Sequence, residues 1–196
     1  MLRAGLLEGT VVATAGGAET IAAACAALGA TTPALEADLL DENAVTAAAA
    51  ELGPVGTLVC DTAPAFVGVG GGVEGLTVGL EGAWNAARAV ANAIWRPGEG
   101  GKLVLLGPRP RDGAHAVALG AALENTARTL SIEWARYSIR PTAVLPADAT
   151  TDDELATLVA YLASPAGDYF SGCAFDFAES VGWPASGGHL GRLRHP

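Results

Sequence analysis

Apolar residues follow two alternating patterns along the chain. Short apolar runs of the kind found in buried strands begin near Gly9, Val55, Lys102, Pro141 and Gly172. Longer segments with apolar residues at helical spacing separate these runs. Strands that alternate with helices are typical of a parallel sheet with helices on both faces. The pattern therefore predicts one α/β domain built on a doubly wound parallel sheet of about six strands.

The helices carry start and stop signals. A helix over residues 19–28 is expected to end at Gly29, because glycine readily adopts the left-handed conformation that ends many helices. Asp41 is placed to cap the next helix, since its side chain can accept hydrogen bonds from free backbone N–H groups. Thr151 and Glu154 have the spacing of a capping box. These signals predict where three of the helices begin or end.

Two segments contain residues that interrupt regular structure. Residues 31–38 (TTPALEAD) are expected to form a short edge strand, because Pro33 has no N–H to donate to a sheet ladder. Residues 64–75 are rich in glycine and are expected to form an irregular loop. The chain shows no internal repeat. We predict a single domain over residues 1–184, followed by a flexible C-terminal tail over residues 185–196.

The charge balance narrows the classes of partner. The chain has 11 lysines and arginines against 21 aspartates and glutamates, a formal net charge of −10. Nucleic-acid binding is not expected, because contacts to phosphate rely on lysine and arginine. No apolar run reaches the roughly 18 residues that a membrane-spanning helix needs, and the first residues do not resemble a secretory signal. These observations predict a cytoplasmic protein without a membrane partner.

The cysteines and histidines suggest no site of their own. Cys25, Cys60 and Cys173 are widely spaced, lack a C-x-x-C pattern and have mostly apolar neighbours. We expect buried free thiols in a reducing compartment. The three histidines are not spaced as metal ligands, so no metal site is predicted.

Several segments resemble the short-chain dehydrogenase/reductase (SDR) family. GGKLVLLGP at residues 100–108 is similar to the strand that precedes the family's catalytic serine. SIEWARYSIRPTAVLP at 131–146 aligns without a gap on the family's "xxExxxxxIRVNxVxPG" segment. LEADLLDENAV at 35–45, VGLEGAWNAARAV at 78–90 and the segment at 161–177 resemble further family motifs. The resemblance covers most of the chain and implies a Rossmann-like sheet with helices on both faces.

The family's catalytic groups are missing from the matching positions. The serine position is Gly107, and the helix asparagine falls on Gly79. The tyrosine and lysine positions fall on Ala116 and Gly120. The only lysine, Lys102, has no tyrosine four residues before it, so no shift of the alignment restores the pair. Without the tyrosine and its neighbouring ammonium, the resemblance implies no catalytic residues of the family type.

The cofactor-binding positions are reduced as well. The family's glycine-rich loop binds pyrophosphate at a helix N-terminus, and Gly16 and Gly17 remain of it here, with Glu19 adding a negative charge. Asp38 matches the family's adenine-side aspartate, and Asp61 lies near the position of asparagines that follow the next strand. We therefore expect no bound cofactor. Gly16, Gly17, Asp38 and Asp61 are interpreted as vestigial cofactor-binding residues, with NAD(P) as the alternative.

In the family, the helices matching residues 79–95 and 114–137 usually pack against another subunit. Both are retained here, which favours a non-catalytic scaffold, a pseudoenzyme subunit that pairs with itself or with an active SDR in a homo- or hetero-oligomer. One alternative is a divergent NAD(P)-dependent oxidoreductase acting on a carbonyl or alcohol, with Asp61 or His115 as an unusual acid. Another is a regulatory module that binds a small ligand in the old cleft.

Overall fold

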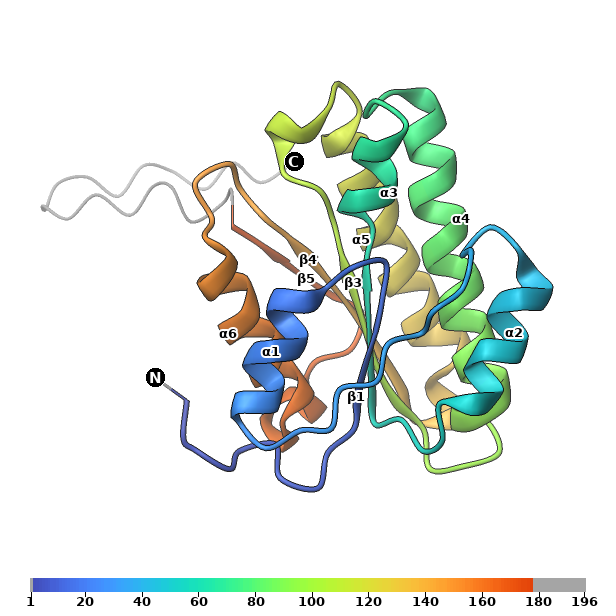
Figure 1. Cartoon of the computed structure of the whole chain (residues 1–196), viewed down its shortest axis with the longest axis vertical. Helices are drawn as coiled ribbons and strands as arrows, with labels where there is room; N and C mark the ends of the chain where they lie inside the picture. Colours follow the sequence, from blue (N-terminus) through green and yellow to red (C-terminus); the bar gives the residue numbers. More distant parts are fainter. Residues whose placement is uncertain (1, 178–196) are drawn as a thin grey trace, which may run out of the picture.

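Five parallel strands form a single sheet in the computed structural model, which describes residues 2–177. The strand order follows the sequence, from one edge of the sheet to the other (Figure 1). The strands are β1 (Val12–Ala15), β2 (Thr57–Asp61), β3 (Gly101–Leu106), β4 (Ile139–Leu145) and β5 (Cys173–Asp176). Because every neighbouring pair is parallel, the carboxyl ends of all strands lie on the same side of the sheet, which we call its carboxyl edge.

Helices cover both faces of the sheet, as predicted. The first and last helices pack against each other on one face, and the helices from the middle of the chain cover the other (Figure 1). The α-helices are α1 (Glu19–Ala27), α2 (Glu42–Glu51), α3 (Ala63–Gly68), α4 (Val73–Val90), α5 (Ala116–Glu133) and α6 (Asp152–Ala163). Shorter helical turns are η1 (Ala91–Trp95), η2 (Pro110–Asp112), η3 (Ala135–Tyr137) and η4 (Pro165–Tyr169). The predicted α/β fold is confirmed.

The predicted helix signals are confirmed. Asp41 accepts hydrogen bonds from two backbone N–H groups at the start of α2, at 2.9 and 3.1 Å. Thr151 and Glu154 form a reciprocal capping box at the start of α6. Gly29, just beyond α1, has a φ of 101°, in the left-handed region that side chains other than glycine rarely adopt.

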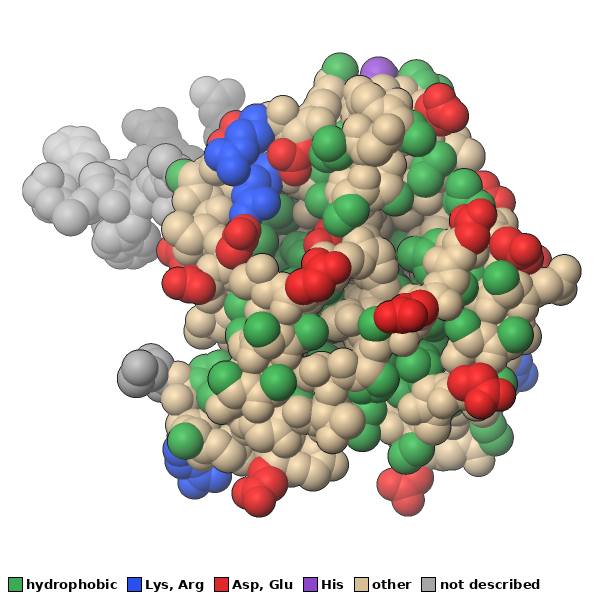
Figure 2. All heavy atoms as spheres, in the orientation of Figure 1, with side chains coloured by type: hydrophobic (Ala, Val, Ile, Leu, Met, Phe, Trp, Pro, Cys, Tyr) green, Lys and Arg blue, Asp and Glu red, His purple; other side chains and the backbone are tan. Residues whose placement is uncertain are grey.

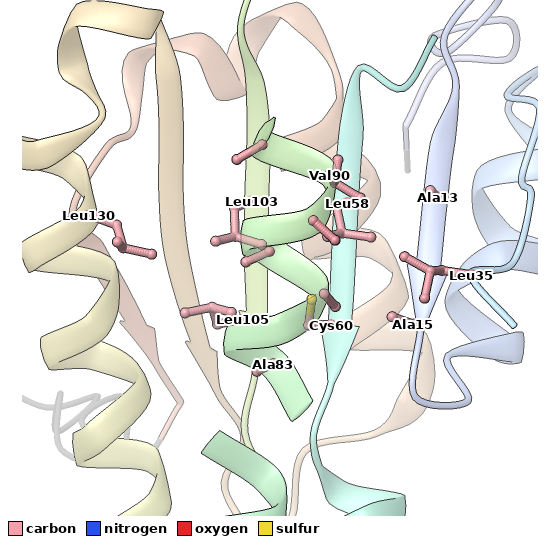
Figure 3. Packing of buried hydrophobic residues seen from close by; sticks show 14 of the residues in the cluster. Ala13, Ala15, Leu35, Leu58, Cys60, Ala83, Val90, Leu103, Leu105 and Leu130 are labelled. Carbon is pink, nitrogen blue, oxygen red and sulfur yellow. The ribbon is translucent and has the colours of Figure 1, made fainter. Parts of the chain in front are cut away.

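The larger core lies between the sheet and α4 and α5. Leu58, Leu103 and Leu105 point from the central strands toward α4, which presents Ala83 and Val90 to them (Figure 3). Small residues on the buried face of a helix let it approach the strands closely. A smaller cluster under α1 and α6 buries the opposite face of the sheet. Helices thus cover both faces of the sheet, which leaves its outer strands and the ends of the strands accessible for a site.

Two local predictions differ from the structure. Residues 31–38 form no regular strand, but Thr31 and Ala34 make isolated parallel bridges to the outer edge of β1. The sheet therefore has five strands and a bridged edge segment instead of about six strands. The segment predicted as an irregular loop begins with α3, because Pro64 lies in the first helical turn, where its missing N–H is not needed. The completely buried ring of Phe66 anchors this helix to the core.

Cys25 and Cys60 are buried free thiols, as predicted, whereas Cys173 is exposed on β5, the edge strand, so the prediction is wrong for this residue. Among residues 2–177, no helix is long and apolar enough to cross a membrane. The tail predicted at 185–196 lies outside the described residues.

Candidate functional site

The ends of β1 and β2 meet at the carboxyl edge of the sheet. The loop after β1 contains Gly16 and Gly17, with φ values of 84° and 97°. A Cβ atom added to Gly16 would lie 2.1 Å from the backbone carbonyl oxygen of Asp61, the last residue of β2. The loop can therefore cross the end of β2 only because this position is glycine. The structure brings together three of the residues singled out in the sequence.

Two cavities flank this crossing, and Asp61 lines both. One of about 190 Å³ lies on the side of α1 and α6 and is lined by Gly17, Glu19, Arg109 and Asp152 among others. The other, of about 270 Å³, lies on the side of α4. Its lining includes Gly16, Asp38, Thr62 and Gly79. We call these the α1 cavity and the α4 cavity. The side chain between them is the carboxylate of Asp61.

The environment of Asp61 raises the pKa of its carboxyl group. Burial is the largest influence and raises the pKa of this carboxyl from 3.8 to about 6. The backbone N–H of Ala63 donates a hydrogen bond to its Oδ1 at 3.0 Å, which lowers the pKa, as does the positive charge of Arg109. The negative charges of Glu19 and Asp112 raise it. The carboxyl of Asp61 therefore changes between its protonated and ionised forms just below neutral pH.

Arg109 is the basic group of the α1 cavity, and its guanidinium is already engaged. It forms an ion pair with Asp152 at the start of α6 and donates to the carbonyl oxygen of Thr150 at 3.2 and 3.3 Å. Its backbone N–H donates to Asp112 at 2.7 Å. Figure 2 shows acidic side chains gathered around the carboxyl end of the sheet, with basic ones there confined to one cluster. Sequence reasoning did not identify Arg109, because its partners lie some 40 residues further along the chain.

Solved structures share this arrangement of strands and helices. BdcA (YjgI) from E. coli matches with a TM-score of 0.68 and 21% identity, over 88% of this chain and 100% of that one. Hydroxysteroid dehydrogenase from Escherichia coli gives 0.69 and 18%, over 88% and 97%. Gluconate 5-dehydrogenase from Burkholderia cenocepacia, in complex with NADP and tartrate, gives 0.72 and 19%, over 90% and 97%. No protein-family model and no curated protein matches the sequence.

The chain has the short-chain dehydrogenase fold. In this fold the dinucleotide pyrophosphate is expected at the N-terminus of α1, and the residues there do not fit it. Glu19 occupies the first turn of α1. A Cβ added to Gly17 would lie 3.7 Å from the carboxylate of Glu19 and 3.5 Å from the ring of Pro64. Glu19, Asp61 and Asp152 place three carboxyl groups around the cavity against a single, paired arginine. A phosphate there would meet like charge, which costs free energy.

Asp38 lies apart from these groups, on the far side of the α4 cavity. Its Oδ1 accepts a hydrogen bond from the backbone N–H of Leu40 at 3.0 Å, which stabilises the turn before α2. Asn85, buried in α4, donates to the carbonyl oxygen of Leu39 at 2.9 Å and holds the same turn against the helix. Asp38 thus has a local structural role, and the lining of the cavity includes it as well.

The positions that the SDR resemblance assigns to catalysis adjoin packed apolar side chains. A Cβ added to Gly79 would lie 2.7 Å from Leu119, and one added to Gly107 would lie 3.3 Å from Leu145. Gly120 faces the same leucine, with 3.4 Å from its Cβ position. Leu119 is completely buried. Leucine side chains therefore adjoin all three positions, and at Gly79 a larger side chain would have to displace Leu119.

His115 lines neither cavity. It lies at the N-terminus of α5, where its backbone N–H donates to the carbonyl oxygen of Gly71 at 3.2 Å. Its buried Nδ1 atom makes no hydrogen bond with the residues that the structure describes. Within residues 2–177, no group of three or more histidine, cysteine, aspartate or glutamate side chains is arranged to hold a metal ion.

Proposed function

We propose that this chain is a truncated, catalytically degenerate SDR that serves as a non-catalytic scaffold, pairing with itself or with an active SDR subunit. The supporting observation is that Gly79, Gly107 and Gly120 stand where the family carries polar catalytic groups, with leucine side chains next to all three. General acid–base catalysis requires a proton-transferring group within hydrogen-bond reach of the substrate. Glycine at these positions supplies none. A cytoplasmic location belongs to the same proposal.

The proposed interface is the outer surface of α4 and α5. Trp84 of α4 is 39% exposed and stacks on Trp134, with ring centroids 6.1 Å apart. Val117 and Ile132 of α5 are 71% and 78% exposed, so apolar side chains lie near both ends of this helix. Aromatic residues are enriched in protein interfaces, and contiguous exposed apolar surface marks interaction sites. This face therefore supports pairing through the helices at 79–95 and 114–137.

The test is the oligomeric state, measured by sedimentation velocity alone and after co-expression with an active SDR. We expect a dimer or larger assembly. Trp84→Ser combined with Ile132→Ser should shift it toward monomer, because both substitutions remove apolar surface from the proposed interface. Tyr169→Ser is the matched control, since Tyr169 is 90% exposed and lies on η4, outside this face. A wild-type chain that stays monomeric alone and with the partner would contradict the proposal.

A divergent NAD(P)-dependent oxidoreductase is the second candidate, and Asp61 is the observation that favours it. A partly buried carboxyl with a pKa of about 6 has the acidity of a general acid that works near neutral pH. Titration with NADH and NADPH, followed by cofactor fluorescence, separates the two proposals. The scaffold proposal predicts no saturable binding, whereas binding with turnover of a carbonyl or alcohol would establish the enzyme.

A regulatory module that binds a small ligand is the third candidate, supported by the α1 and α4 cavities that meet at Asp61. A thermal-shift screen with nucleotides and acyl thioesters tests it. A ligand that binds the folded state raises the unfolding temperature by an amount that grows with its concentration and affinity. Absence of any shift would remove this candidate.

A further inference from the structure

A shallow apolar groove lies on the outer surface of α6, separate from the two cavities beside Asp61. Leu158 and Tyr161 of α6 line it, together with Leu2 from the N-terminal segment and Phe177 just beyond β5. The groove measures about 560 Å³, more than either cavity beside Asp61, and apolar atoms line almost all of it. We call it the α6 groove.

Acidic residues border the groove at one end. Asp153 and Glu154, in the first turn of α6, belong to its lining, and both are exposed. Glu154 accepts hydrogen bonds from Thr151 in the capping box, whereas the side chain of Asp153 makes no hydrogen bond or ion pair with another described residue. The groove therefore combines an apolar floor with a negative rim. A suitable occupant has apolar side chains followed closely by positive charge.

The chain itself carries such a sequence immediately after the groove. Phe177 is the last described residue, and residues 178–196 (AESVGWPASGGHLGRLRHP) follow it. They contain Trp183, a large apolar side chain, and the run GRLRH, in which Arg192 and Arg194 flank a leucine. Glu179 is the only acidic residue among them. This composition is complementary to the α6 groove in both polarity and charge.

We propose that residues 178–196 bind in the α6 groove of their own chain, with Trp183 on the apolar floor and Arg192 or Arg194 beside Asp153. The connection is short, because the segment begins at the groove wall and an extended chain spans about 3.3 Å per residue. Tethering also gives the segment a high effective concentration at the groove, which favours it over a free partner of equal affinity. This proposal is independent of the proposed function and replaces the flexible tail that the composition alone predicts.

The test measures the solvent exposure of Trp183 in the full-length chain by hydroxyl-radical footprinting and mass spectrometry. Thr157→Arg places a long, positively charged side chain in the groove at an exposed helical position, where it should not disturb folding. We expect Trp183 to be oxidised at least about threefold more slowly in the wild type than in this variant. Thr129→Arg, on the exposed face of α5, is the matched control and should leave the wild-type rate unchanged.

A reciprocal variant probes the groove itself. In Trp183→Ser we expect faster oxidation of Leu158 and Tyr161, while the buried Trp95 serves as an internal reference for folding. Asp153→Asn should weaken the protection of Trp183 to a smaller degree, and added salt should do the same. Equal oxidation of Trp183 in the wild type and Thr157→Arg would overturn the proposal. Protection that rises with protein concentration would also overturn it, because a second copy would then cover the groove.

Discussion

The two sides of the sheet at its carboxyl end differ in how they use space. On the side of α4, Leu119 packs against Gly79, a position that the SDR resemblance assigns to catalysis, and the α4 cavity has a largely apolar lining. On the side of α1, a cavity of about 190 Å³ is open and its lining is acidic. The α4 side thus offers mainly apolar surface. The α1 side is lined by charges that oppose a phosphate.

The two sides also differ in how their side chains contribute to stability. Apolar filling stabilises the protein, because buried leucine gains free energy from leaving water. The partly buried carboxylate of Asp61 has the opposite effect, since its ionised form is less well solvated than in the unfolded chain. If the scaffold proposal holds, substitutions on the two sides should therefore change stability in opposite directions.

The largest effect is expected at the crossing of the two strand ends. Gly16→Ala should lower the free energy of unfolding by more than about 4 kcal/mol, because the new Cβ would lie 2.1 Å from the carbonyl oxygen of Asp61. Gly53→Ala is the control, since Gly53 has a similar positive φ of 69° but nothing within 4 Å of its Cβ position. Urea denaturation measures both. Equal losses would mean that backbone conformation alone, and not the close approach, requires glycine at Gly16.

The leucine packing should respond next. Leu119→Ala is expected to lower the free energy of unfolding by about 2–5 kcal/mol, because Leu119 is completely buried and the cavity left behind collapses only partly. Gly79→Asn should cost about 1–3 kcal/mol through overpacking against the same leucine. The double variant should lose less stability than the sum of the separate losses, by about 0.5 kcal/mol or more. If the two losses in free energy of unfolding simply add in the double variant, Leu119 does not occupy the space that the introduced asparagine needs.

Asp61→Asn should stabilise the protein. In the wild type the pKa of Asp61 is raised from 3.8 to about 6 on folding, so the folded state binds the proton more tightly than the unfolded state. Stability is then lost as the pH rises from about 4 to about 6 and stays reduced above that range, by at most about 3 kcal/mol. The uncharged amide of the variant would avoid this loss and keep an oxygen for the N–H of Ala63. Thermal unfolding between about pH 4 and about pH 8 brackets this range and measures the difference.

The control for this prediction is Asp38→Asn, because Asp38 is exposed and its oxygen accepts a similar local hydrogen bond. We expect its stability to follow the wild-type pH dependence. If Asp61→Asn were less stable than the wild type at neutral pH, the ionised carboxylate would have to gain more from its neighbours than it loses by burial.

The smallest effect is expected at Arg109, whose charge lowers the pKa of Asp61. Arg109→Gln should move the pH at which stability is lost upward, by less than about 1 unit, because the guanidinium is shared with Asp152 and Thr150. Arg111→Gln is the matched control, since Arg111 bonds to Asp148 and is absent from the cavity lining. An unchanged midpoint in Arg109→Gln, read by carbon-13 chemical shifts of the carboxyl, would contradict this coupling.

Much of the frame follows from local chemistry that can be read along the chain. The capping pair Thr151 and Glu154 and the helix stop at Gly29 were predictable because each depends on neighbours within a few residues. The same holds for the missing polar groups at Gly79 and Gly107, since the identity of a side chain needs no structure. The prediction of an irregular loop over residues 64–75 was wrong, because α3 is anchored by the buried ring of Phe66. This tertiary interaction cannot be read from composition.

The site depended on contacts between residues far apart in the chain. Burial of Asp61, the engagement of Arg109 by Thr150 and Asp152, and the filling of space by Leu119 and Leu145 all arise when strand ends and helices meet. Free energies of solvation and packing depend on what surrounds a group in three dimensions. Residue types thus decided which polar groups are absent from the positions that the SDR resemblance assigns to catalysis, and the tertiary arrangement decided what surrounds those positions and how the remaining charges influence one another.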